Sequence, residues 1–277
     1  MSGRVAKGRV LIVAGSDSSG GAGLQADIKT VTVLGGFAMT AVTAVTVQNT
    51  LGVFGIHEVP APVVIGQIRA ALEDIGVDAL KTGMLHSAEV IQGVAATLEE
   101  LDISVPLVVD PVMVAKGGAS LLEDDAIKAL KTHLIPRAAV VTPNIPEAEA
   151  LTGMVIKTSD DQAKAGEKIM AMGAKAVLVK GGHMAGDQVV DVLVSSAGPP
   201  EKFSSPRINT VHTHGTGCTL ASAIATMLAQ GRPLSLAVVR AHDYVYEAIR
   251  TAPGFGQGHG PLNHVHTLPD ELGLRDE

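Results

Sequence analysis

The chain has 277 residues, of which 46% are apolar and 18% charged, and its formal net charge is −7. This balance predicts a folded protein with a large buried core and argues against disorder. Nucleic-acid binding requires positive charge for the phosphates and aromatic side chains for base stacking. This chain has a net negative charge, and aromatic residues make up only 2% of it. We therefore expect no nucleic-acid partner.

The single cysteine, Cys218, excludes an intrachain disulfide framework and is typical of a reducing compartment. No uncharged apolar run approaches the length of a membrane span. The first ten residues contain no apolar stretch of the kind that marks a signal peptide. These features predict a cytoplasmic protein with no membrane partner.

Strand and helix patterns alternate along the chain, as judged from apolar runs and from apolar residues at helical spacing. The predicted strands are 10–14, 39–47, 56–59, 79–82, 106–109, 138–142 and 176–180, followed by a hairpin of 188–195 and 201–208. The predicted helices are 24–34, 63–75, 88–101, 124–134, one from about 146, 159–172 with Ser159 as N-cap, 216–229 and 234–250. Repeated strand-then-helix units predict an α/β protein with a largely parallel sheet, helices on both of its faces and the hairpin at one edge.

Functional residues are expected at one edge of this sheet, because ligands of open α/β folds bind beyond the carboxyl ends of the strands. The strands are predicted to end near Gly15, Thr82, Asp110, Thr142 and Lys180. The search for chemistry therefore concentrates on the segments that follow these residues.

A glycine-rich loop over 15–23 (GSDSSGGAG) follows the first strand and opens a helix. Its glycines allow close backbone approach to a ligand, and a helix start favours anions. The loop lacks the Gly-Lys-Ser/Thr ending of a Walker loop and the glycine spacing of a dinucleotide fingerprint. A tight strand-to-helix turn explains the same residues equally well.

Asp27 and Gln48 are polar residues next to predicted strand or helix ends. Asp27 has Val31 rather than a basic residue four positions later, so it either stabilises the helix start or accepts hydrogen bonds from a substrate amine. Gln48 follows an apolar run and can donate and accept at once, which suits the edge of a heterocycle. In isolation, a glutamine at this position is more often an ordinary loop residue.

Asp110, Asn144, Glu147 and Lys180 follow three successive predicted strands. A carboxylate at this edge is suited to Mg²⁺. Asn144 and Glu147 lie three residues apart, which fits either a magnesium site or a capping box at a helix start. Lys180 precedes two glycines and can reach a polyphosphate as a point charge.

The most informative segment is 214–219 (HGTGCT), which precedes a helix with an apolar stripe. Successive N–H groups from Gly215 to Cys218 would form an anion cradle at the helix start, where a transferring phosphoryl group needs stabilisation. The helix dipole is expected to lower the pKa of the Cys218 thiol. An isolated cysteine is more often an inert buried residue, but after Gly-Thr-Gly at a helix start a functional role is favoured.

Together these motifs resemble the ribokinase-like family, and most closely its hydroxymethylpyrimidine and phosphomethylpyrimidine kinase branch. The matching segments are 14–26 (AGSDSSGGAGLQA), 47–50 (VQNT), 81–85 (KTGML), 110–117 (DPVMVAKG), 142–147 (TPNIPE), 180–183 (KGGH), 213–219 (THGTGCT) and 258–264 (GHGPLNH). No single segment is decisive, but eight in register are highly specific. The resemblance implies a three-layer α/β/α sandwich with a mostly parallel central sheet and a small edge β element. It also implies one kinase domain over 1–277, with 1–8 and 266–277 as peripheral tails.

The resemblance also implies roles for individual residues. The pyrimidine substrate would be bound by Gly15, Asp27, Gln48, Met84 and Val112; ATP by Asn144, Glu147, Lys180, Gly215, Thr216 and Gly217; and Mg²⁺ by Asp110 and Glu147. Catalysis would fall to Cys218, Gly215 and Gly217. Most ribokinase-like enzymes have an aspartate base at the end of this loop, whereas Cys218 stands here, as in the pyrimidine kinase branch. The base is either this thiol or is replaced by positioning and charge stabilisation.

The implied reaction is transfer of the γ-phosphoryl group of ATP to 4-amino-5-hydroxymethyl-2-methylpyrimidine, and then to its monophosphate. The nearest alternative is a pyridoxal or pyridoxine kinase, which Gln48 disfavours because related pyridoxal kinases tend to lack this glutamine. A non-catalytic nucleotide sensor and an NAD-dependent oxidoreductase fit the motifs less well. The resemblance further implies a homodimer or larger homo-oligomer, with sheet-edge residues within 40–59 available for pairing.

Overall fold

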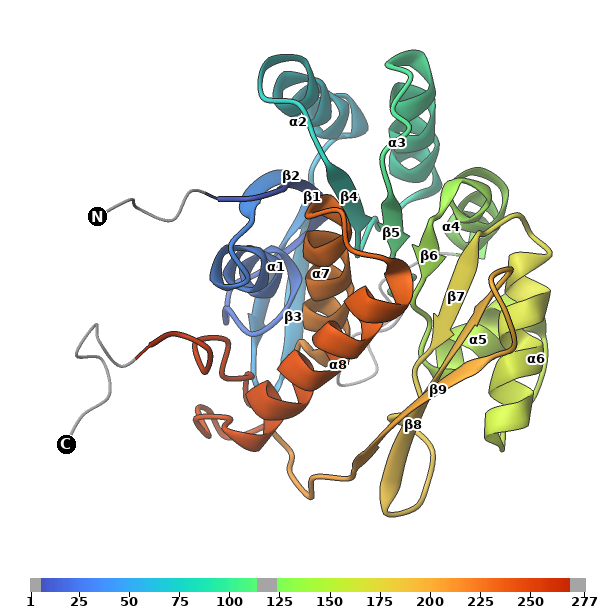
Figure 1. Cartoon of the computed structure of the whole chain (residues 1–277). Helices are drawn as coiled ribbons and strands as arrows, with labels where there is room; N and C mark the ends of the chain where they lie inside the picture. The colour runs from blue at the N-terminus through green and yellow to red at the C-terminus, as the bar shows by residue number, and fades with distance from the viewer. Residues whose placement is uncertain (1–5, 114–123, 270–277) are drawn as a thin grey trace.

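The structure is a computed structural model that describes residues 6–113 and 124–269. Within these residues the strands form a single sheet in the order β3-β2-β1-β4-β5-β6-β7-β8-β9 (Figure 1). The strands are β1 (Arg9–Asp17), β2 (Phe37–Asn49), β3 (Gly52–Glu58), β4 (Ala79–Thr82), β5 (Leu107–Val109), β6 (Val140–Val141), β7 (Ala176–Val179), β8 (Gln188–Ser195) and β9 (Glu201–Pro206). Of the sequence segment 110–117, the structure describes residues 110–113, and residues 114–117 lie outside the described residues.

The six neighbouring strands β2, β1, β4, β5, β6 and β7 pair in parallel in this order. The strands at the two edges of the sheet pair antiparallel. At one edge β2 and β3 form a hairpin. At the other edge β8 pairs antiparallel with both β7 and β9. The predicted hairpin of 188–195 and 201–208 is thereby confirmed, although β9 ends at Pro206.

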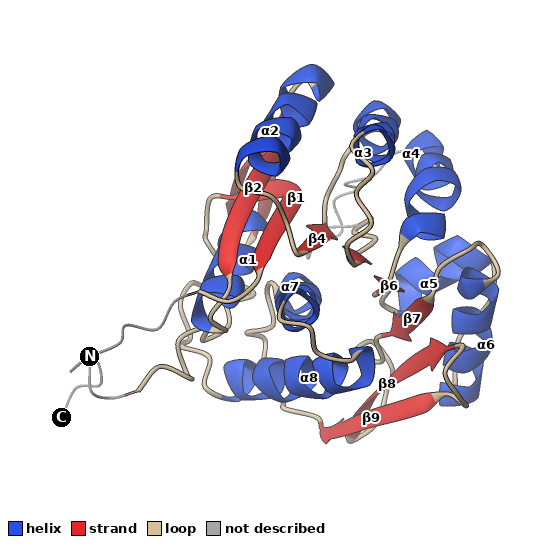
Figure 2. Cartoon of the chain, turned by 45° about the horizontal axis from the view of Figure 1, so that its top comes forward, coloured by secondary structure: helices blue, strands red, loops and turns tan. Residues whose placement is uncertain are grey.

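Helices cover both faces of the sheet and complete three layers (Figure 2). The helices are α1 (Gly23–Val33), α2 (Ala61–Asp74), α3 (Ala88–Glu100), α4 (Asp124–Ala129), the π-helical turn η1 (Leu130–Leu134), the 3₁₀ turn η2 (Ile135–Arg137), α5 (Ile145–Thr152), α6 (Ser159–Met170), α7 (Thr216–Ala229) and α8 (Leu234–Arg250). Helices α1, α7 and α8 lie on one face, and α2 to α6 lie on the other. This is the three-layer α/β/α arrangement expected from the sequence.

The apolar runs of the central strands face both helical layers. Along β1, Leu11 and Val13 belong to the core beneath α2 and α3, whereas Val10 and Ile12 belong to the core beneath α1 and α7. Side chains alternate between the faces of a strand, so a strand covered on both faces must be apolar at consecutive positions. This explains why an aliphatic sequence nearly free of aromatic residues forms this sheet.

Besides shifts of up to about four residues at several strand and helix ends, two local predictions differ from the structure. The predicted helix 124–134 is α4 followed by η1, and helix α6 is capped by Thr158 rather than by Ser159. The Thr158 side chain accepts from the Asp161 N–H, and the Asp161 carboxylate accepts from the Thr158 N–H. This reciprocal capping box holds two otherwise unpaired donors. Gln162, the partner that a box at Ser159 would need, is buried, and its side-chain amide donates to the carbonyl groups of Val179 and Val190 instead. No helix of the described residues is long and apolar enough to cross a membrane.

Candidate active site

A cavity of about 730 Å³ opens at the carboxyl ends of β1, β4, β5, β6 and β7. Its walls include Gly15, Gln48, Met84, Asp110, Val112, Asn144, Glu147, Lys180, Gly215, Thr216, Gly217 and Cys218. These are the residues singled out in the sequence, apart from Asp27. Residues as far apart in the chain as Gly15 and Cys218 are therefore brought together at the carboxyl ends of the strands, where an α/β sheet is expected to bind its ligand.

Two glycine loops contact each other at the mouth of this cavity. Gly215 has a φ of +81°, and a Cβ atom placed on it would lie 1.9 Å from the carbonyl oxygen of Gly21. Gly23 has a φ of +53°, and a Cβ atom there would lie 2.4 Å from the carbonyl oxygen of Gly15. Only glycine can adopt this left-handed backbone at such a short distance from another chain segment. Steric exclusion of a side chain therefore explains why both motifs have glycine at these positions.

Asp17 and His214 tie the two loops together by side-chain hydrogen bonds. His214 Nε2 lies 2.8 Å from Asp17 Oδ2, and the same carboxylate accepts from the N–H groups of Ser19 and Ala22. Burial would raise the pKa of Asp17, but the bonds from His214 and Ser19 outweigh it and lower that pKa. His214 Nε2 also lies 3.3 Å from Gln48 Nε2, so the network reaches the end of β2.

Lys180 and Asp110 form an ion pair in the same cavity. Lys180 Nζ lies 3.0 Å from Asp110 Oδ1, which also accepts from the Thr142 hydroxyl. A Cβ atom on Gly217 would lie 3.1 Å from Lys180 Nζ and 3.7 Å from Asp110 Oδ2. The start of α7 thus faces this ion pair. Burial lowers the pKa of Lys180, but Asp110 and Glu147 more than offset it and keep the ammonium charged.

Asn144 and Glu147 form a complete capping box at the start of α5. The Asn144 side chain accepts from the Glu147 N–H at 2.9 Å, and Glu147 Oε2 accepts from the Asn144 N–H at 2.8 Å. Burial raises the pKa of Glu147 to about 7, opposed by Lys180 and assisted by Asp110. The capping role left open by the sequence is therefore present, and the carboxyl group also lines the cavity.

Cys218 stands in the first turn of α7, half-buried at the cavity wall. The expectation that the helix start lowers its pKa is wrong. Burial raises the pKa of the thiol to about 11, and Lys81, which acts in the opposite direction, does not compensate. Removing the charged thiolate from water disfavours it more than the neighbouring positive charge favours it.

Asp27 is the predicted site residue that the structure keeps out of the cavity wall. Its side chain is fully buried, and its oxygens lie 2.8 and 3.0 Å from Lys81 Nζ. The Ser222 hydroxyl donates to the same carboxylate at 2.7 Å. A direct bond from Asp27 to a substrate amine is replaced here by a bond to Lys81, which does line the cavity.

Sequence reasoning assigned no role to several polar residues of this cavity, among them Lys81, Asp17 and Asp191. Asp191 lies on β8 and accepts from the Gly181 N–H at 2.8 Å, next to Lys180. Lys81 had a usable signal, because a lysine inside a strand that is otherwise buried requires an anionic partner. The long-range contacts of Asp17 and Asp191 carried no such signal, since His214 lies 197 positions from Asp17 and Gly181 lies 10 positions from Asp191.

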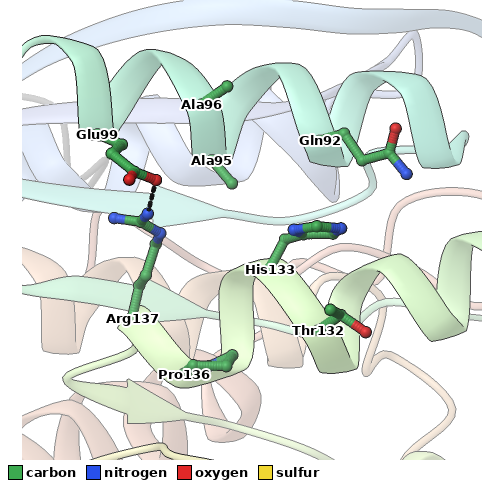
Figure 3. Close-up of a pocket in the computed structure, with 8 residues that line it drawn as sticks. All are labelled: Gln92, Ala95, Ala96, Glu99, Thr132, His133, Pro136 and Arg137. Atoms are coloured by element: carbon green, nitrogen blue, oxygen red, sulfur yellow. Dashed lines mark hydrogen bonds and ion pairs between the residues drawn. The ribbon is translucent and has the colours of Figure 1, made fainter.

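A second hollow of about 660 Å³ lies between α3 and the η1–η2 turns (Figure 3). It is lined by Gln92, Ala95, Ala96, Glu99, Thr132, His133, Pro136 and Arg137, and Arg137 is paired with Glu99. Its one arginine is therefore already neutralised by a carboxylate. None of the residues selected from the sequence lines this hollow, so the cavity at the strand ends is the candidate site.

The fold and this cavity define an α/β phosphotransferase of ribokinase-like architecture. The model of the phosphomethylpyrimidine kinase family matches residues 17–263, and the chain belongs to that family. It is 49% identical to the hydroxymethylpyrimidine/phosphomethylpyrimidine kinase of Bacillus subtilis, over 92% of this chain and 94% of the relative. It is 53% identical to the bifunctional thiamine biosynthesis protein ThiED of Geobacter sulfurreducens, over 95% of this chain, and spans about half (54%) of that relative.

Solved structures agree with this assignment. The phosphomethylpyrimidine kinase of Clostridium difficile 630 has a TM-score of 0.78 and 43% identity, over 88% of this chain and all (100%) of that one. The ADP complex of Bacillus subtilis pyridoxal kinase has a TM-score of 0.86 and 36% identity, over 94% of this chain and 98% of that one. The expected fold and the expected enzyme class are confirmed.

The contact between the two glycine loops leads to a first prediction. Gly215→Ala should lower the free energy of unfolding by at least about 1–3 kcal/mol, because the new Cβ meets the Gly21 carbonyl in a left-handed backbone. Urea unfolding monitored by circular dichroism measures this loss. The matched control is Gly66→Ala in α2, where nothing lies within 4 Å and which should be neutral or stabilising by up to about 1 kcal/mol. Equal stability of the two variants would contradict the assigned contact.

Proposed function

We propose that the chain transfers the γ-phosphoryl group of ATP to the hydroxymethyl oxygen of 4-amino-5-hydroxymethyl-2-methylpyrimidine, and then phosphorylates the monophosphate to the pyrophosphate, in thiamine biosynthesis. One observation carries this proposal: Gln48, Lys180 and the 215–218 loop share a single cavity. A heterocycle at Gln48 and a phosphate at Lys180 are then neighbours, which is the geometry that phosphoryl transfer requires.

The acceptor end of the cavity combines an apolar wall with an amide. Met84 packs with Ala44 and Val112 in a small cluster, and its sulfur would lie 3.2 Å from a Cβ atom on Gly15. The absence of a side chain at Gly15 leaves room beside this wall for a flat ring. The Gln48 amide provides a donor and an acceptor for the ring nitrogens and the amino group.

The donor end of the cavity is suited to a polyphosphate. Lys180 supplies a positive charge, and the first-turn N–H groups of α7 point to the same region. Helix α8 contributes Val245 and Ile249 to the wall, which are suitable for an adenine ring. The pyridoxal kinase of Staphylococcus aureus, 35% identical with a TM-score of 0.86, is known in complexes with ADP and with AMP-PCP. This supports ATP as the phosphoryl donor.

Asp110 and Glu147 are the residues that would hold Mg²⁺. The described residues contain no cluster of three or more His, Cys, Asp or Glu side chains able to bind a metal by themselves. Mg²⁺ is usually held by one or two carboxylates together with waters and substrate phosphates, and these two side chains line the cavity beside Lys180. The donor set therefore fits. When bound, the ion would neutralise charge on the phosphates.

The acceptor alcohol must lose a proton during the transfer. A thiol whose pKa is about 11 is mostly protonated at neutral pH, so Cys218 holds little preformed thiolate. We propose that the alcohol proton passes to the minor thiolate form of Cys218, which becomes the neutral thiol as the oxygen–phosphorus bond forms, and that positioning and the backbone N–H groups of the 215–217 loop contribute most of the rate. Gly215 and Gly217 act through their backbone N–H groups.

A pyridoxal kinase remains the alternative reading, since structures of that class resemble the chain at 34–36% identity. The pyrimidine kinases are more similar, at 43–49% identity. Gln48, at the acceptor end, also favours the pyrimidine, because its amide matches an aminopyrimidine edge.

An acceptor assay tests the proposed function. ADP release should depend on the hydroxymethylpyrimidine and on its monophosphate, with pyridoxal at least about tenfold poorer in kcat/KM because one mismatched hydrogen-bonding edge costs about 1.4 kcal/mol or more. Gln48→Met should raise KM for the pyrimidine more than KM for ATP. A higher kcat/KM for pyridoxal, or no acceptor-dependent ADP, would overturn the assignment.

Glu147 gives a stability prediction that depends on pH. Burial raises its pKa from 4.5 to about 7 in the folded protein, so between these values the folded state keeps a proton that the unfolded state has released. The wild type should therefore lose stability relative to Glu147→Gln as pH rises from about 4.5 through about 7. Urea unfolding of both proteins between pH 4.5 and 8 measures the difference, and the glutamine can retain the capping box. A difference independent of pH would contradict the buried carboxyl.

We further propose a cytoplasmic homodimer that pairs through the β2–β3 edge. Large apolar side chains are exposed there, with Val47 at 64%, Leu51 at 61% and Phe54 at 66% exposure. An exposed apolar edge of this kind is typical of an interface between subunits. The free thiol of Cys218 is consistent with a reducing compartment.

The dimer proposal predicts the effect of charge at this edge. Val47→Glu with Phe54→Glu should convert the dimer to monomer in size-exclusion chromatography with light scattering, because two carboxylates per subunit would be buried in the contact. Val155→Glu, at a valine that is 70% exposed elsewhere, is the matched control and should leave the dimer intact. A monomeric wild type would end the proposal.

A further inference from the structure

Lys81, on strand β4, places a positive charge inside the protein at the wall of the cavity. The whole residue is 0% exposed, and its ammonium contacts both oxygens of Asp27. A Cβ atom on Gly83 would lie 2.9 Å from the ammonium nitrogen, so the group has little freedom to move. Desolvation lowers the pKa of Lys81, but Asp27, Cys218 and Asp110 outweigh it and keep the group cationic.

This ion pair needs an explanation beyond stability. Replacing a buried ion pair by apolar residues of similar volume is often neutral or stabilising, because the desolvation cost of two charges is rarely recovered. A methionine at position 81 and a leucine at position 27 would therefore be expected to give the folded protein about the same stability as the ion pair. The location of the pair, against the cavity in which the phosphoryl group is transferred, provides the alternative explanation.

Helix α7 connects the ion pair to Cys218. Ser222 follows Cys218 by four residues, so the two side chains lie on one face of the helix, one turn apart. Cys218 lines the cavity, whereas the Ser222 hydroxyl donates to Asp27 at 2.7 Å behind it. The Lys81–Asp27 pair is thus held between β4, α1 and α7, one helical turn from Cys218, and Lys81 and Cys218 line the same cavity.

We propose that Lys81 is a positioning residue whose ammonium, fixed by Asp27 and Ser222, stabilises the thiolate form of Cys218 that accepts the proton and the negative charge that develops on the acceptor oxygen during phosphoryl transfer. Its action on the acceptor rests on the proposed function. Its action on the thiol does not.

The charges around Cys218 act in opposite directions, and this makes the proposal testable. Lys81 on β4 and Lys180 after β7 favour the thiolate, whereas Asp27 on α1 and Asp110 after β5 disfavour it. Removing the Lys81 charge should therefore make the thiol less acidic, and removing the Asp27 charge should make it more acidic. A purely structural role would not give shifts of opposite sign.

The test uses Cys218 as its own reporter, since it is the only cysteine of the chain. The rate of alkylation by iodoacetamide, followed by mass spectrometry of the intact protein from pH 7 to 10.5, is proportional to the thiolate fraction. Lys81→Met should lower the rate at a given pH about tenfold, equivalent to one unit of pKa. Asp27→Asn should raise it, and Lys164→Met on the exposed face of α6 should leave it unchanged.

A double variant guards against loss of the fold. Lys81→Met with Asp27→Leu removes both charges and should fold, as judged by circular dichroism and urea unfolding, with an alkylation rate between those of the single variants. The same variant should lower kcat at least about tenfold while KM for ATP changes less than twofold. Shifts of the same sign in the two single variants, or none in either, would overturn the proposal. Shifts as expected without pyrimidine kinase activity would leave the role of Lys81 on the thiol standing and refute the proposed function instead.

Discussion

The site depends on the contact between two glycine loops that are almost 200 residues apart in the chain. Gly215 can approach the Gly21 carbonyl only because it has no side chain and adopts a left-handed backbone. The bond between His214 and Asp17 closes the same junction. This junction fixes the start of α7 relative to the end of β1, and therefore sets the distance between the phosphate region and the acceptor region.

A second property of the site is the concentration of charge where the protein is least hydrated. Lys81 and Lys180 each face a carboxylate, Asp27 and Asp110, and all four groups are largely buried. Electrostatic interactions are stronger in such surroundings than in water. Groups that are already oriented by their partners need not reorganise when charge develops on a transferring phosphoryl group, which is the main source of catalysis in reactions of this type.

Much of this arrangement could be predicted from the sequence. The bounds of α7 and α8 follow from apolar spacing, and the cavity follows from the rule that ligands bind at the carboxyl ends of parallel strands. The environment of Asp27 and the acidity of Cys218 could not be predicted in the same way. Both depend on Lys81, which lies 54 residues from Asp27 in the chain, and on the extent of burial, which only the packed structure defines. Sequence motifs identified which residues lie near one another in the site. They did not show that Asp27 would bond to Lys81 in place of a substrate.

The central claim is that a phosphoryl donor and a heterocyclic acceptor meet between the 215–218 loop and Gln48. The most direct measurement is a crystal structure with a non-hydrolysable ATP analogue and the hydroxymethylpyrimidine bound together. The account predicts the terminal phosphate within hydrogen-bonding distance of the Gly217 and Cys218 N–H groups and the ring against Gln48 and Met84. A nucleotide bound in the hollow between α3 and η1, or a pyrimidine away from Gln48, would contradict it.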